Sequence, residues 1–140
     1  MPRRVAHVPC LLLGLGIASL CATGPALAEI DCANAGTTVE LNFCADKDYQ
    51  AADKALNAAY ADAVAYNRTR EMDKPSDKTK LEAAMRNAQR AWVAYRDSDC
   101  KDLVALEWSG GTGATSAILG CMTEKTIQRT KELKERYAEH

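Results

Sequence analysis

Residues 81–100 read LEAAMRNAQRAWVAYRDSDC, and this stretch decides the fold. Its larger apolar side chains and alanines recur at steps of three and four residues, which is the period of one buried helix face. They are Leu81, Met85, Ala88, Trp92 and Tyr95. The pattern predicts an amphipathic helix with Trp92 and Tyr95 in the core, running into charged residues beside the thiol of Cys100.

The N-terminal residues have the three-part pattern of a secretory signal peptide. Two arginines precede an apolar run at residues 8–20, and Ala-Leu-Ala at residues 26–28 fits a cleavage site. The run is shorter than the ~20 residues that span a bilayer, and Leu20 before Cys21 fits a lipoprotein signal poorly. We expect a cleaved signal peptide at 1–28 and a periplasmic or secreted domain at 29–140 without a transmembrane anchor. A retained anchor is the alternative.

Charge narrows the class of partner. The leader holds two of the 18 basic residues and no acidic residue, so 16 basic and 19 acidic residues remain, a net charge of −3. Nucleic acid requires a basic face, so the composition argues against a nucleic-acid partner. A mild acidic excess favours a basic partner.

Four of the six cysteines follow the leader: Cys32, Cys44, Cys100 and Cys121. An even number of cysteines in a small exported domain predicts two disulfides. The alternative is a four-thiolate metal site, but no C-x-x-C pair is present and an oxidising compartment disfavours free thiols. We therefore predict no metal and no cofactor.

Three helices account for residues 38–137. Thr37 and Glu40 have the spacing of a capping box before a first helix that ends near residues 67–69. A linker at 71–77 contains Pro75, with Ser76 or Asp77 capping a second helix that ends near residue 107. Residues 109–113 contain three glycines, which predict a loop before a third helix at about 114–137. The fold class is all-α, an elongated antiparallel three-helix bundle with two disulfides.

The register of the helices gathers all four cysteines at the end of the bundle that holds the glycine loop. Geometry alone allows more than one pairing; we favour the local one, Cys32 with Cys44 and Cys100 with Cys121. Each bridge could contribute ~2–4 kcal/mol to a narrow bundle.

The same register predicts a structural polar layer between the first two helices. Asp53 lies near the level of Trp92 and Arg96, and Asn57 lies near Gln89. We expect Arg96 to pair with Asp53 or Asp97 and to fix the register of the helices. In the alternative, these side chains are all solvated.

The residues offer little for catalysis. His7 lies in the leader and His140 is the last residue, so no internal imidazole serves a nucleophile or a metal. A glycosidase that uses two carboxylates is not excluded by composition, but a slender bundle has little cleft in which to desolvate an acid. We expect no enzyme.

The candidate partner contact is Trp108 with the loop that follows it: Ser109, Gly110, Gly111 and Thr112. An exposed indole beside glycines is a plausible contact point for a protein. Alternatively, Trp108 folds back and caps the end of the bundle.

The chain resembles the lysozyme inhibitor LprI family of small exported bacterial proteins. The most specific match is Q-R-A-W-x-x-Y-R-D-x-x-C at residues 89–100. The other matching positions are Glu40, Cys44, Asp53, Leu56, Asn57, Tyr60, Gly110, Gly111, Cys121, Thr126, Arg129 and Leu133. The resemblance implies a helical, disulfide-bonded domain in the cell envelope.

The family is named after a mycobacterial lipoprotein that inhibits lysozyme, so the resemblance implies a non-catalytic periplasmic lysozyme inhibitor. This chain lacks a good lipoprotein signal, so we expect a soluble form. No inhibitory residue is carried over, because no family motif marks one. The alternative function is an envelope interaction or assembly factor with no effect on lysozyme.

Overall fold

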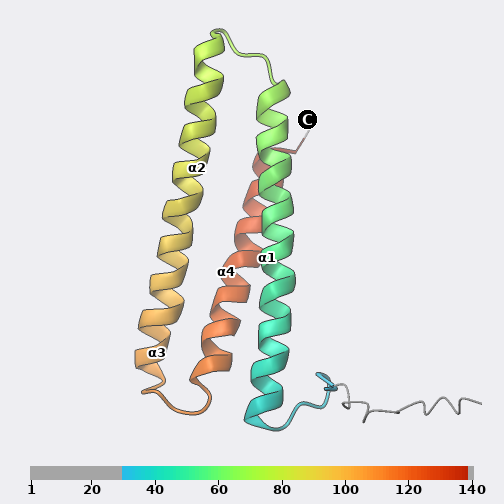
Figure 1. The fold of residues 1–140 in the computed structure, drawn as a ribbon, viewed down its shortest axis with the longest axis vertical. Helices are drawn as coiled ribbons and strands as arrows, with labels where there is room; N and C mark the ends of the chain where they lie inside the picture. The colour runs from blue at the N-terminus through green and yellow to red at the C-terminus, as the bar shows by residue number, and fades with distance from the viewer. Residues whose placement is uncertain (1–29, 139–140) are drawn as a thin grey trace, which may run out of the picture.

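The computed structural model describes residues 30–138, and within that range it is entirely helical, without strands (Figure 1). The elements are α1 (Thr38–Thr69), α2 (Pro75–Asp97), the π-helical turn η1 (Ser98–Leu103), α3 (Val104–Glu107) and α4 (Ala114–Arg136). The predicted signal peptide and His140 lie outside the described residues. Among the described helices, none is long and apolar enough to cross a membrane.

The helix boundaries follow local chemistry. The predicted capping box is present: Thr37 Oγ1 accepts from the Glu40 N–H at 3.3 Å, and Glu40 Oε2 accepts from the Thr37 N–H at 2.9 Å. The prediction that Ser76 or Asp77 caps the second helix is wrong. Pro75 is the first residue of α2, where its missing N–H and fixed φ are tolerated, and Lys74 is the N-cap without a side-chain hydrogen bond.

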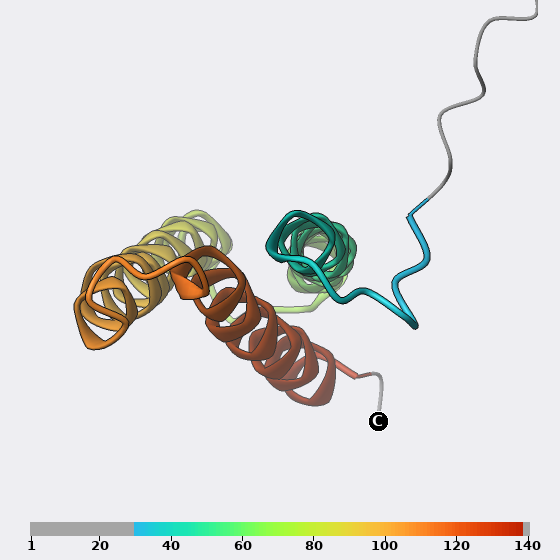
Figure 2. The same ribbon diagram turned by 90° about the horizontal axis from the view of Figure 1, so that it is seen from below.

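The described chain forms three long helical segments, which we call rods: α1, the continuous segment α2–η1–α3, and α4. α1 and α2 are antiparallel; η1 and α3 continue α2 to the end at which α1 begins (Figure 1). α4 then returns along the other two, packing most extensively on α1. Viewed along the rods, the start of α4 lies between α3 and α1 (Figure 2).

The apolar core is thin. Leu56 and Ala59 of α1 meet Leu133 of α4, with Trp92 and Tyr60 packed against them. Four polar side chains are also buried: Asn67, Arg96, Thr126 and Thr130. Covalent links therefore matter more here than in a domain with a large core.

The prediction that Tyr95 belongs to the core is wrong, because its side chain is 56% exposed. α2 turns Met85, Trp92 and Arg96 toward its neighbours, and Arg96 is only 5% exposed. At 3.6 residues per turn, position 96 lies nearer than position 95 to the line through 85 and 92. The arginine therefore takes the buried position that the apolar pattern assigned to the tyrosine.

Both favoured disulfides are present. Cys32–Cys44 ties the lead-in to α1, and Cys100–Cys121 joins η1 to α4, each with a Cα–Cα distance of 5.6 Å. Sequence periodicity predicted a plain α-helix through residue 107. The structure instead has a π-helical turn there, in which the Val104 N–H donates to the Asp99 carbonyl, and Cys100 within it is 0% exposed.

Candidate functional site

Backbone hydrogen bonds close the loop after α3. The Trp108 N–H donates to the Val104 carbonyl at 3.1 Å, and the Gly111 N–H donates to the Trp108 carbonyl at 2.9 Å. Ser109 and Gly110 have φ values of 50° and 68°, in the left-handed region. Glycine adopts this region without steric cost, which explains Gly110.

Trp108 is half-exposed and braced. Its side chain is 50% exposed, and one side of the ring lies against Gly113, where an added Cβ would come within 2.5 Å of the indole. The indole thus folds back in part onto the loop and still presents half of its surface to solvent. Of the predicted contact residues, Ser109, Gly110, Gly111 and Thr112 are also exposed.

Exposed apolar side chains gather at this end of the bundle. Six of the eight large exposed hydrophobic residues in the described chain lie here. They are Val39, Leu41 and Phe43 of α1, and Leu103, Leu106 and Trp108 of the η1–α3 segment. We call the end that carries them and both disulfides the disulfide end.

A groove of about 640 Å³ opens at the disulfide end. Phe43 and Tyr49 of α1 line it together with Ile118 and Met122 of α4, and Lys101 of η1 completes the rim. The lining surface is mainly apolar. This groove was missed by sequence analysis, because its residues come from three segments whose relative placement no local pattern shows.

The structure places Arg96 at the centre of a polar cluster. Its Nη1 lies 3.6 Å from Asp53 Oδ1, and its Nη2 lies 2.9 Å from Asp97 Oδ1. The guanidinium also lies over the rings of Tyr49 and Trp92, at 5.5 and 5.2 Å from their centroids. Cation–π contacts of this kind stabilise a desolvated arginine.

The other two residues of the predicted polar layer make no hydrogen bond to Arg96 among the described residues. Asn57 is exposed and donates from Nδ2 to Asp53 Oδ2 at 3.0 Å, within α1. Gln89 Oε1 accepts from Arg129 Nε at 3.3 Å, so it links α2 to α4. Sequence analysis also missed Thr126, which is 0% exposed and accepts from Arg96 Nη1 at 3.3 Å. Its family position was the only signal that pointed to it.

Two ionisable groups in this region have shifted pKa values. Partial burial opposes ionisation of Asp97, but the hydrogen bonds from Lys101 and Arg96 outweigh it and lower the pKa of that carboxyl. The hydrogen bond with the Tyr95 hydroxyl, followed by that with Asp99, raises the pKa of Lys125. Both groups are therefore held charged in structural ion pairs.

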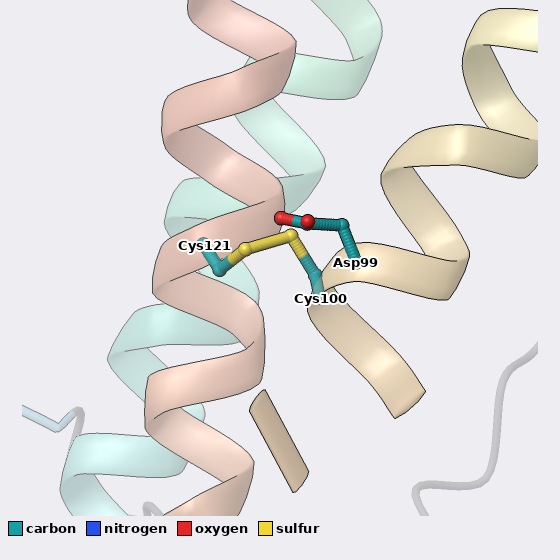
Figure 3. Close-up of side chains that lie close together, drawn as sticks. All are labelled: Asp99, Cys100 and Cys121. Carbon is teal, nitrogen blue, oxygen red and sulfur yellow. A yellow bond between two sulfur atoms is a disulfide. The ribbon is translucent and has the colours of Figure 1, made fainter. Parts of the chain in front are cut away.

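Asp99, Cys100 and Cys121 form the described cluster with the closest resemblance to a metal site (Figure 3). The two sulfurs are bonded to each other, so neither is a thiolate that could bind a metal. The Asp99 carboxylate lies beside the disulfide and pairs with Lys125 Nζ at 3.0 Å. The cluster is a covalent and ionic clamp between η1 and α4.

Fold and site together define a class of small, entirely helical proteins, braced by disulfides at an end where exposed apolar side chains gather. The chain belongs to the LprI family: the family described as "Lysozyme inhibitor LprI" matches residues 30–133. A relative in Rhizobium meliloti (strain 1021), the uncharacterized protein R02472, is 41% identical over 122 residues, which cover 83% of this chain and 87% of that protein. No solved structure matches the chain.

Proposed function

We propose that the protein is a non-catalytic lysozyme inhibitor of the LprI type that acts in the periplasm after its signal peptide is cleaved. The observation that carries this proposal is the match of residues 30–133 to the family described as "Lysozyme inhibitor LprI". The two disulfides favour an oxidising compartment outside the cytoplasm.

A binding role suits the residues better than catalysis does. The chain has no histidine between residues 8 and 139, and the shifted carboxyl of Asp97 is held ionised by its partners. A general acid requires the opposite shift, toward a raised pKa. By contrast, a half-exposed tryptophan on a braced loop is a common anchor in protein interfaces.

A lysis assay tests the proposal. Protein purified from the periplasm, with its disulfides intact, is titrated into hen egg-white lysozyme acting on a suspension of Micrococcus cells. We expect the loss of turbidity to slow as the protein approaches the lysozyme concentration, and a complex to elute on gel filtration. Trp108→Ala should weaken inhibition at least about thirtyfold, since hot-spot residues, among which tryptophan is enriched, cost about 2 kcal/mol or more when truncated, and each 1.4 kcal/mol is tenfold.

The matched control is Ile127→Ala, which removes an equally exposed apolar side chain of α4 away from the disulfide end. It should inhibit as well as the wild type. No slowing at a hundredfold molar excess, together with no complex, would reject the inhibitor. The envelope interaction or assembly factor would then be the better account.

A further inference from the structure

We propose that the groove at the disulfide end receives an apolar side chain of a basic protein. The identification of lysozyme as that protein rests on the proposed function above; the groove and its preference for a basic partner do not. The surface would therefore be wider than the Trp108 loop alone, extending across α4 to α1.

The groove has the size and lining of a docking site. Its volume of about 640 Å³ lies within the range of roughly 300–1,000 Å³ typical of ligand pockets. Phe43 on its rim is 48% exposed. An inserted aromatic or aliphatic side chain would cover this ring and the apolar surface of Ile118 and Met122.

One wall of the groove carries an unsatisfied hydrogen-bond acceptor. Asn42 lines the groove, and its Oδ1 is shielded from solvent and has no hydrogen-bond partner among the described residues. Such atoms in native proteins require an explanation, since an unmade buried hydrogen bond costs roughly 1–3 kcal/mol. Rotation of the Asn42 side chain toward the groove would let an N–H donor of an inserted partner satisfy this oxygen.

The charges on the rim favour a cation. Lys101 Nζ lies 2.9 Å from Asp97 Oδ2, and the two cations Lys101 and Arg96 are balanced by the two carboxylates Asp97 and Asp53. Asp46 accepts from the neutral amide of Gln50 at 2.6 Å and has no ion-pair partner among the described residues. The groove therefore presents one uncompensated negative charge.

The charges of the described residues are also divided unequally between the two ends of the bundle, with the negative excess at the disulfide end. The contacts of Arg96 with Asp53 and Thr126 set a common level in the three rods. On the side of the disulfide end, residues 30–54 and 96–126 contain ten acidic and five basic residues, a net charge of −5. On the other side, residues 55–95 and 127–138 contain seven acidic and eleven basic residues, a net charge of +4. A basic protein would be steered to the disulfide end and repelled from the other.

Binding measurements on four variants test this surface. Phe43→Ser and Asp46→Lys alter the groove. Ile127→Ser and Asp62→Lys are matched controls with the same chemical change at exposed positions on the other side. Circular dichroism and urea unfolding establish that each variant is folded. Two probes are used: hen egg-white lysozyme, and a lysine-rich peptide of 12 residues with one central tryptophan.

If lysozyme binds, we expect both groove variants to weaken its affinity at least tenfold and both controls to change it less than twofold. If all four variants bind lysozyme as tightly as the wild type, the proposal for the groove is overturned, while lysozyme binding itself stands. Weakening by Asp46→Lys and Asp62→Lys alone would also overturn it, because it would indicate a diffuse effect of charge.

If wild-type protein does not bind lysozyme, the proposed function fails and the peptide decides the inference. Two results together would support the groove: the wild-type protein binds the peptide but the Phe43→Ser variant does not, and a peptide with serine in place of tryptophan does not bind. Absence of peptide binding would overturn the inference. Self-association in sedimentation experiments that Phe43→Ser abolishes would also overturn it, because a second copy of the chain would then occupy the groove.

Discussion

Arg96 of α2 donates a hydrogen bond from Nη1 to Oγ1 of Thr126 on α4, at 3.3 Å, and neither side chain has appreciable exposure. Through this pair, and through Asp53 on α1, one guanidinium contacts all three rods. We propose that Arg96 fixes the register of the bundle where the apolar core is thin. Its charge is compensated by two carboxylates that remain partly solvated.

Replacing this arginine should destabilise the protein. Arg96→Met removes the contacts with Tyr49 and Trp92 and leaves Thr126 without a donor, for an expected loss of about 2 kcal/mol in the free energy of unfolding. Arg90→Met is the control: Arg90 is exposed on the same helix, so the change should be within about 0.5 kcal/mol. Urea unfolding measures both. Equal midpoints for the two variants would contradict the role given to Arg96.

The two disulfides should contribute unequally. The Cys100–Cys121 bridge closes 21 residues between two rods, whereas Cys32–Cys44 closes 12 residues and holds the lead-in to α1. Loop length alone favours the longer bridge by about 0.5 kcal/mol, and Cys100 is fully buried while Cys32 is exposed. We expect Cys100→Ser with Cys121→Ser to cost ~2–4 kcal/mol, more than the Cys32→Ser, Cys44→Ser pair. Thermal unfolding of the two double variants measures both losses of stability, and a larger loss for the Cys32→Ser, Cys44→Ser pair would contradict this expectation.

Two glycines should respond oppositely to alanine. At Gly113 a Cβ would meet the Trp108 ring at 2.5 Å, so Gly113→Ala must displace the indole, at an expected cost of about 1–2 kcal/mol. Gly120 lies within α4 with open space around it, so Gly120→Ala should stabilise by about 0.5–1 kcal/mol. Urea midpoints give both signs. Trp108 fluorescence in a Trp92→Phe background should shift for Gly113→Ala only.

The capping box predicts a pH dependence. Hydrogen bonds from the backbone N–H groups of Thr37 and Gly36 lower the pKa of Glu40 from its ordinary 4.5. A carboxyl whose pKa is lower in the folded state stabilises fully above its unfolded value and loses that stabilisation as the pH falls through the folded value.

Wild type should therefore be more stable than Glu40→Gln at pH 7, and the difference should shrink below about pH 4.5. Glu71→Gln, an exposed position in the α1–α2 linker, serves as the control and should show no such trend. Unfolding midpoints between pH 3 and 7 provide the measurement. A difference that grows toward low pH would refute the sign of the effect.

Periodicity and local chemistry predicted the parts of the fold that depend on neighbours in sequence. The three long helical segments and the capping box at Thr37 follow from spacing. Spacing allowed more than one disulfide pairing, and the favoured local pairing is the one present. The burial of polar residues could not be predicted from sequence spacing. Arg96 and Thr126 are buried because each finds partners on another rod, and a pattern of hydrophobicity carries no information on such partners.

The candidate site was predicted to a similar extent. Trp108 beside glycines identified one exposed aromatic residue. The groove required Phe43, Lys101 and Ile118 to be brought together from distant segments. The π-helical turn at Cys100 had no sequence signal, since its residues are equally compatible with a regular α-helix.

The central claim is that the disulfide end is the binding surface, and nuclear magnetic resonance tests it most directly. Unlabelled lysozyme is titrated into ¹⁵N-labelled protein, and amide shifts are followed along the chain. We predict that the largest changes fall in residues 38–50 and 101–122. Changes confined to residues 66–80, at the opposite end of the bundle, would contradict the account.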